Sequence, residues 1–350
     1  MHWVNTWSEN SKDRYQCFAS VLQLFVLFLQ ISSFSGPSFV KYKRLPRGTR
    51  ASASDMQPSA LCASVPVALL SSFVLAALYV GCLYVWAGHH TNGRRAPDRD
   101  DPRVVKERFI RVGLVSLLAP CVTLAAAALP GGRTPCTPEV PLLRWFGLAP
   151  PSALSMLLAT LLPLLLTMVL FIGPLFTAWI DRDEHSPLAT QLRQRVQAAD
   201  ARTLRNLVVG PVSEEWVFRA CMCPLLRGAG LSDSACVFTS GAVFGLAHVH
   251  HVFDANAPWI AVAVQFTYTS LFGTYSSYLF LRSGMLYGAV LAHAFCNLMG
   301  LPDFGRAIDE KRTTGVAFVV GLGSFIVLVT LDAIYRPPLF HSALWAEAAM

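Results

Sequence analysis

The chain has 350 residues, 54% of them hydrophobic and only 14% charged. Soluble domains carry about 25% charged residues, so this composition excludes an ordinary soluble protein and indicates an integral membrane protein. The net charge of +7 comes mostly from arginines and lysines in short loops between apolar runs. That pattern is typical of membrane topology, and we expect no nucleic-acid partner.

Residues 1–55 differ from the rest of the chain. An apolar run at 17–34 is followed by a basic run at 41–50, and Met56 offers a second plausible start. The run fits a cleaved signal peptide poorly and fits a signal anchor or an extra span better. We therefore expect an N-terminal extension at 1–55, a membrane-embedded domain at 56–336 and a C-terminal tail at 337–350.

Apolar runs long enough for a bilayer core, which is about 30 Å thick, recur along the remaining chain. The predicted helices lie at 66–86, 111–129, 151–180, 211–226, 234–250, 259–281, 283–301 and 315–335. The helix at 211–226 is short and charged, so it is predicted to be partly re-entrant, with Pro211 in its first turn. The fold class is therefore all-α and polytopic, with about seven to eight transmembrane helices around a buried cavity.

Two polar loops fix the expected orientation. The loop at 87–110 is dense in arginine and lysine, and the loop at 181–206 contains five arginines. If the spans alternate, both loops lie on one side of the membrane, which the positive-inside rule makes the cytosolic side. The helix at 211–226 follows the second loop directly, so the site mouth is expected to face the cytosol.

Two adjacent glutamates and an arginine interrupt the apolar half of the chain, in the stretch PVSEEWVFR. An ionised carboxylate in hydrocarbon costs at least about 2.5–3.5 kcal/mol, so such residues are functional candidates. Glu215 and Arg219 are spaced i, i+4 and are predicted to form an ion pair. Glu214 is rotated by about 100° from Glu215, so it needs another partner or a catalytic role.

Two later helices supply polar side chains. Phe244 and His248 share one helix face, and Phe244 is predicted to pack beside the imidazole. His293 and Asn297 share a face of another apolar helix. Both helices carry a GxxxG pattern, at 241–245 and 284–288, which favours close helix packing and would bring the two histidines together. Cys221 and Cys223, just after the glutamates, are predicted to be core residues.

These side chains are the parts of a hydrolytic site. A carboxylate and an imidazole can deprotonate a water. A second imidazole and an amide can donate hydrogen bonds to an oxyanion, each worth about 3 kcal/mol. The sequence contains neither a GxSxG serine motif nor an HExxH zinc motif.

The motifs EExxxR (Glu214, Glu215, Arg219), FxxxH (Phe244, His248) and HxxxN (His293, Asn297) together resemble those of the type II CAAX prenyl proteases. These are the Ras-converting enzymes of the ABI family of intramembrane glutamate proteases. The resemblance covers residues 205–300, and the string FGLAHVHH is especially similar to the eukaryotic members.

The resemblance implies an endopeptidase of the endoplasmic reticulum membrane, open to the cytosol, that removes the last three residues of prenylated CaaX proteins. It implies that Glu214 and His248 activate water, that His293 and Asn297 stabilise the oxyanion, and that Glu215, Arg219 and Phe244 support the site. Its expected partners are farnesylated or geranylgeranylated proteins such as small GTPases, with membrane lipid beside an apolar groove. No cofactor is expected.

Two alternatives remain open from the sequence. Glu214, His248 and His293 could instead be the three protein ligands of a catalytic zinc ion. The same buried polar residues could also serve a non-catalytic scaffold or a transporter. No convincing internal repeat of the kind found in transporters is present.

Overall fold

The computed structural model describes residues 63–84, 101–129, 141–150, 152–180, 200–250, 259–301, 312–331 and residue 342. Every regular element within these ranges is helical, which confirms the all-α prediction. Four of these helices are long and apolar enough to cross a membrane. They are α3 (Val65–Cys82), α4 (Pro102–Ala128), α6 (Ala153–Leu170) and α16 (Arg312–Thr330). The predicted extension at 1–55 lies outside the described residues, as does the tail apart from Ser342.

Two predicted spans have different limits in the structure. The span expected at 151–180 is divided at Phe171 into α6 and α7 (Ile172–Ile180). The span expected at 111–129 begins nine residues earlier, because the Asp101 side chain accepts a hydrogen bond from the Arg103 N–H at 2.8 Å. An aspartate N-cap followed by a proline is a strong helix start, so part of the predicted polar loop is helical.

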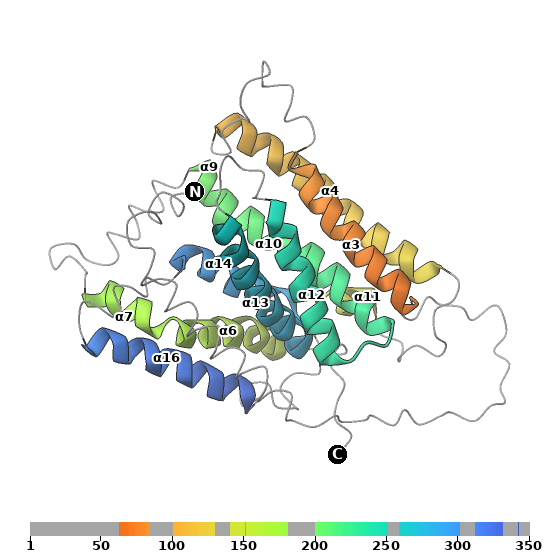
Figure 1. The fold of residues 1–350 in the computed structure, drawn as a ribbon. Helices are drawn as coiled ribbons and strands as arrows, with labels where there is room; N and C mark the ends of the chain where they lie inside the picture. Colours follow the sequence, from red (N-terminus) through yellow and green to blue (C-terminus); the bar gives the residue numbers. More distant parts are fainter. Residues whose placement is uncertain are drawn as a thin grey trace, which may run out of the picture.

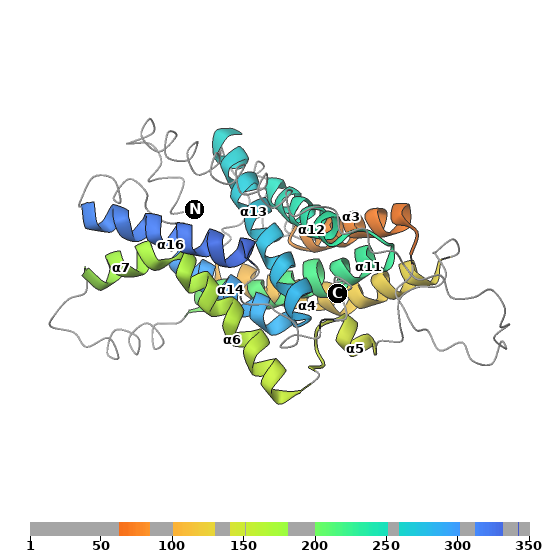
Figure 2. The ribbon, with the colours of Figure 1, turned by 90° about the horizontal axis from the view of Figure 1, so that it is seen from below.

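The helices form three groups (Figures 1 and 2). Helices α3 and α4 pack against each other, as do α12 (Asp233–His248) and α13 (Trp259–Ser283), while α6, α7 and α16 form a third group. Helix α14 (Leu286–Met299) packs against α6 and also against the helical segment at 201–228 that carries Glu214 and Glu215. It therefore connects the third group to that segment, which is called the glutamate segment below. A short helix, α5 (Leu142–Trp145), precedes α6.

The glutamates lie on one continuous helical segment that is longer than predicted. It consists of α9 (Ala201–Leu204), η2 (Arg205–Val209), α10 (Gly210–Glu215), η3 (Trp216–Cys221) and α11 (Met222–Gly228), with right-handed helical backbone at each junction. Pro211 lies in the first turn of α10, as predicted, but helical backbone already begins at Ala201. The two η segments are wide π-helical turns, which occur often at functional sites. Here they lie on either side of Glu214 and Glu215.

Helix α4 anchors this segment through a carbonyl that a proline leaves unpaired. Pro120 has no N–H, so it cannot bond to the carbonyl of Ser116 four residues earlier. The indole Nε1 of Trp216 donates to that Ser116 oxygen at 2.8 Å. Two turns further along α4 from Ser116, the Thr123 hydroxyl lies 3.1 Å from the Cys221 carbonyl oxygen. The wide turn that follows the glutamates is therefore held by α4 at both of its ends.

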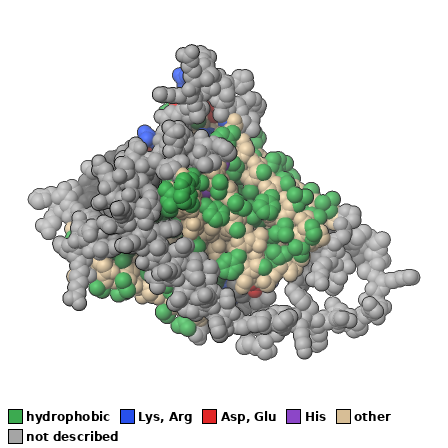
Figure 3. All heavy atoms as spheres, in the orientation of Figure 1, with side chains coloured by type: hydrophobic (Ala, Val, Ile, Leu, Met, Phe, Trp, Pro, Cys, Tyr) green, Lys and Arg blue, Asp and Glu red, His purple; other side chains and the backbone are tan. Residues whose placement is uncertain are grey.

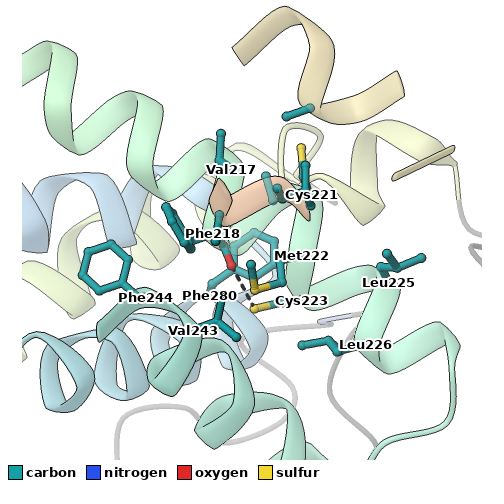
Figure 4. Packing of buried hydrophobic residues seen from close by; sticks show 14 of the residues in the cluster. Val217, Phe218, Cys221, Met222, Cys223, Leu225, Leu226, Val243, Phe244 and Phe280 are labelled. Atoms are coloured by element: carbon teal, nitrogen blue, oxygen red, sulfur yellow. Dashed lines mark hydrogen bonds between the residues drawn. The ribbon is translucent and has the colours of Figure 1, made fainter. Parts of the chain in front are cut away.

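Large buried side chains pack around η3 and α11, the part of the segment that follows the glutamates (Figure 4). Phe218, Met222 and Cys223 are fully buried there, and the Cys223 thiol lies 3.6 Å from the Phe218 carbonyl oxygen. The cysteines at 221 and 223 are both core residues, as predicted. By contrast, large apolar side chains on α6 and α16 are exposed, and the described surface in Figure 3 shows many hydrophobic and few charged side chains, as expected for a protein surrounded by lipid.

The two GxxxG patterns do produce close packing, but they do not face each other. A Cβ atom on Gly241 would lie 2.7 Å from the Thr274 nitrogen of α13, and one on Gly245 would meet Ser270 of the same helix. A Cβ atom on Gly288 would meet α6 at Pro163, 2.6 Å from its ring. The predicted close approach of the two patterns is therefore wrong. The first pattern packs on α13 and Gly288 packs on α6, while Gly284 lies before the start of α14, beside Ser342.

Candidate active site

Glu215 is fully buried, and both of its carboxylate oxygens have partners. Oε2 lies 3.1 Å from Arg219 Nε and accepts a hydrogen bond from the Ser276 hydroxyl at 2.6 Å. Oε1 lies 2.7 Å from His293 Nδ1. The predicted ion pair with Arg219 is therefore present, but it belongs to a larger group contributed by three separate helical segments. A buried carboxylate with this many donors is stabilised in its charged form.

Arg219 is held by a backbone carbonyl and two aromatic rings. Its Nη2 donates to the carbonyl oxygen of Gly273 on α13 at 3.2 Å. Its guanidinium carbon lies 4.3 Å from the centre of the Phe244 ring and 5.9 Å from that of Phe272. Cation–π contacts of this kind are stronger where water is excluded, and Arg219 is fully buried.

Glu214 lies in a more open environment than Glu215. Its side chain is 21% exposed, and its Oε2 lies 3.8 Å from His293 Nε2. That separation is too long for a direct hydrogen bond and leaves room for a shared small group such as a water. The predicted need for another partner is met by His293, which contacts Glu215 through one ring nitrogen and faces Glu214 with the other.

The protonation of both histidine rings follows from their partners. A carbonyl oxygen only accepts hydrogen bonds, so His248 Nδ1, which lies 2.8 Å from the Phe244 oxygen, carries a hydrogen. In the neutral ring Nε2 is then the nitrogen that can accept a proton. His293 Nδ1 likewise donates to Glu215 Oε1, so its Nε2 is the atom directed at Glu214.

Phe244 brings the two histidines to one site. Its ring centre lies 4.6 Å from that of His248 and 6.2 Å from that of His293. Phe272 of α13 also packs against His293, with a centre-to-centre distance of 4.7 Å. The predicted packing of Phe244 against the His248 imidazole is present.

Asn297 lies one turn beyond His293 and is exposed. Its Nδ2 donates to the carbonyl oxygen of Asn206 in η2 at 2.9 Å. This bond joins the end of α14 to the start of the glutamate segment. The predicted face shared by His293 and Asn297 is thus present, with Asn297 at the outer edge of the site.

A catalytic zinc ion needs three protein ligands grouped around one point. Within the described residues, no three His, Cys, Asp or Glu side chains are grouped closely enough to hold a metal. The arrangement of Glu214, His248 and His293 in this structure therefore does not match a three-ligand zinc site.

Several residues of this site were not predicted from the sequence. Ser276 and Gly273 of α13 contact Glu215 and Arg219, and α13 carries none of the three motifs. The Ser213 hydroxyl donates its single hydrogen to the Val209 carbonyl. In its 2.8 Å contact with Tyr79 of α3, the tyrosine hydroxyl is therefore the donor. Polar residues within apolar segments are a general signal for contacts with a buried polar site. The adjacent serines at 276 and 277 gave that signal in the sequence.

Together the helical fold and this group of side chains define a membrane protein with a carboxylate–imidazole site of the kind that can activate water. Residues 199–299 match the family model described as type II CAAX prenyl endopeptidase Rce1-like. CAAX prenyl protease 2 of Homo sapiens is 38% identical over 79% of this chain and 83% of the relative. CAAX prenyl protease 2 of Rattus norvegicus is 36% identical over 82% of this chain and 88% of the relative.

A probable CAAX prenyl protease 2 of Schizosaccharomyces pombe is 34% identical over 75% of this chain and 91% of the relative. No solved structure gives a significant match. The chain belongs to the family of type II CAAX prenyl endopeptidases. The resemblance noted in the motifs and the predicted enzyme class are thereby confirmed.

Proposed function

We propose that this protein removes the C-terminal tripeptide from prenylated CaaX proteins by means of a water molecule activated at Glu214. The observation that carries the proposal is the contrast between the two glutamates. Glu215 is buried and neutralised by its partners, whereas Glu214 is partly exposed and faces a histidine nitrogen across 3.8 Å. A carboxylate in that position can accept a proton from a water that also contacts the substrate carbonyl.

The residues divide the reaction as follows. Glu214, assisted by His248 Nε2, takes a proton from the water. At the same time the water oxygen attacks the carbonyl carbon of the prenylated cysteine. His293, as an imidazolium paired with Glu215, donates from Nε2 to the developing oxyanion, and the Asn297 amide donates a second hydrogen bond. The C–N bond then breaks, and the proton held at Glu214 passes to the departing amine of the tripeptide. Each oxyanion donor contributes about 3 kcal/mol.

Exposed apolar side chains on the glutamate segment and on α12 support an isoprenoid substrate. Val208 and Val212 on the glutamate segment are 48% and 46% exposed, and Leu246 on α12 is 49% exposed. A farnesyl or geranylgeranyl chain bound along these residues would remove them from water or lipid head groups and hold the modified cysteine near the site. Small GTPases that carry such chains are the proposed substrates, with membrane lipid as the surrounding solvent.

The proposed location is the endoplasmic reticulum membrane, with the site open to the cytosol. Asn297 and Asn206 lie at the outer edge of the site, and α9, at the start of the same segment, packs against α4. The first turns of α4 carry Arg103, Lys106 and Arg108, which are typical of a cytosolic helix end.

The test is cleavage of a farnesylated CaaX peptide by the purified full-length protein in liposomes, with excess chelator present. Wild type should release the tripeptide and Glu214→Ala should not, because the proposed reaction needs the carboxylate and no metal. Cleavage that stops with chelator and returns with added zinc would overturn the metal-independent mechanism. Folded wild type without cleavage under either condition would favour the scaffold or transporter role.

A further inference from the structure

Buried hydroxyl groups on the described helices usually donate to the carbonyl four residues earlier on the same helix. Ser72, Thr123, Thr167, Thr269, Ser277 and Ser283 all do so. Ser240 and Thr123 also contact a backbone carbonyl of the glutamate segment, whereas the Ser276 hydroxyl donates to a charged side chain, Glu215 Oε2, at 2.6 Å. Ser276 and Glu215 are both fully buried, so this donor contacts the carboxylate in a site from which water is excluded.

We propose that Ser276 is a positioning residue for peptide-bond hydrolysis, acting through Glu215 on His293. This inference rests on the proposed endopeptidase function. Ser276 neither contacts Glu214 nor needs to reach the substrate. It determines where the Glu215 carboxylate lies, and the carboxylate determines the orientation of the imidazole that faces Glu214.

The contacts form an unbroken series across three helices. Ser276 on α13 holds Oε2 of Glu215, whose Oε1 accepts the hydrogen of His293 Nδ1 at 2.7 Å. The opposite ring nitrogen of His293 lies 3.8 Å from Glu214 Oε2. A hydrogen-bonded carboxylate fixes both the tautomer and the ring plane of an imidazole, as an aspartate does in hydrolases with a Ser-His-Asp triad.

Arg219 cannot replace Ser276 in this role. Its Nε lies 3.1 Å from the same Oε2 atom, but its Nη2 is committed to the Gly273 carbonyl and its guanidinium lies over the Phe244 ring. Without the Ser276 hydroxyl, Glu215 would remain paired with Arg219 but would lose its shortest hydrogen bond. The carboxylate could then rotate toward the guanidinium and turn the His293 ring away from Glu214.

The next residue on α13 provides a matched control. Ser277 is also fully buried, and its hydroxyl contacts Ser240 Oγ at 2.9 Å and the Gly273 carbonyl at 2.8 Å. Replacing either serine by alanine removes one buried hydroxyl from the same helix. Only Ser276→Ala removes a donor to Glu215, so the two variants separate positioning of the site from general packing.

The experiment measures kcat and KM of the full-length protein in liposomes with a farnesylated CaaX peptide, for wild type, Ser276→Ala, Ser277→Ala and Ser276→Thr. Loss of a hydrogen bond to a charged group should lower kcat of Ser276→Ala by about tenfold or more, with KM within about twofold of wild type. Ser277→Ala should keep kcat within about twofold. Ser276→Thr retains the hydroxyl and should recover most of the lost kcat.

Four outcomes overturn the inference. The first is a kcat of Ser276→Ala equal to that of wild type, and the second is an equal loss of kcat in both alanine variants. The third is a kcat of Ser276→Thr as low as that of Ser276→Ala. A change confined to KM would assign Ser276 to substrate binding instead. Wild type that does not cleave the peptide would overturn the proposed function itself, which is a separate result from an active wild type that tolerates Ser276→Ala.

Discussion

Glu214 and Glu215 are neighbours in the chain but lie in opposite surroundings. Glu215 has no exposed surface, and its two oxygens contact an arginine, a serine and a histidine. Glu214 keeps 21% of its side chain exposed and faces the second nitrogen of the same histidine. One carboxylate is thus fixed by the protein, and the other is left able to bind a water and exchange protons. A rotation of about 100° between adjacent helical residues is sufficient to separate the two roles.

His293 is the residue that connects the two glutamates. An imidazole has two nitrogens on opposite sides of its ring, so it can contact both glutamates although they point in different directions. Phe272 and Phe244 pack around this ring and limit its rotation. In the proposed mechanism, the buried glutamate contributes to the reaction through the histidine that it orients.

The largest expected effect comes from Glu214→Gln. The amide keeps the size of the side chain but cannot accept a proton, so kcat should fall by about 10²–10⁴-fold. Because Glu214 is partly exposed and is not part of the Glu215 ion pair, the melting temperature in detergent should stay within a few degrees of wild type. Tripeptide release and thermal unfolding measured on the same preparation check both statements. A Glu214→Gln protein that cleaves at the wild-type rate would remove Glu214 from the mechanism.

The main expected effect of Arg219→Met is a lower stability of the folded protein. Methionine fills much of the same volume but leaves Glu215 as a buried carboxylate without its cation, a change that typically destabilises by about 3–5 kcal/mol. We expect a lower melting temperature and a reduced yield of folded protein. The control is Arg219→Met combined with Glu215→Gln, which removes the uncompensated charge and should recover much of the stability. A single variant as stable as wild type would contradict the role of Arg219 as the neutralising partner.

Asn297→Ala tests the outer edge of the site. If Asn297 donates to the oxyanion, kcat should fall by about 10²–10³-fold while KM changes little. Its amide also bonds to the Asn206 carbonyl, so a purely structural role is the competing explanation. In that case the variant would unfold at a lower temperature and keep most of its kcat. Measuring kcat and the unfolding temperature of Asn297→Ala on the same preparation separates the two.

The fold class and the main helices could be predicted from the sequence because apolar runs of bilayer length are a strong local signal. The ion pair of Glu215 with Arg219 was predictable for a related reason, since i, i+4 spacing fixes which side chains meet on one helix. Both features depend on residues that are close in the chain.

Contacts between distant helices were not predictable in the same way. Nothing in the spacing of the GxxxG pattern at 241–245 indicates that it packs on α13 instead of α14. The bond from Ser276 to Glu215 joins residues 61 positions apart and depends on how α13 crosses the glutamate segment. The division of the predicted span at 151–180 was also missed, since the sequence stays apolar across Phe171.

The smallest expected effect concerns the attachment of the glutamate segment to α4. Trp216→Phe removes the donor to the Ser116 carbonyl and should lower the free energy of unfolding by about 1 kcal/mol. Pro120→Ala supplies an N–H that can bond to the same carbonyl within α4. Trp216→Phe should therefore be less destabilising in the Pro120→Ala background, giving a coupling energy in a double-mutant cycle. Strictly additive effects would show that the indole does not replace the hydrogen bond lost at Pro120.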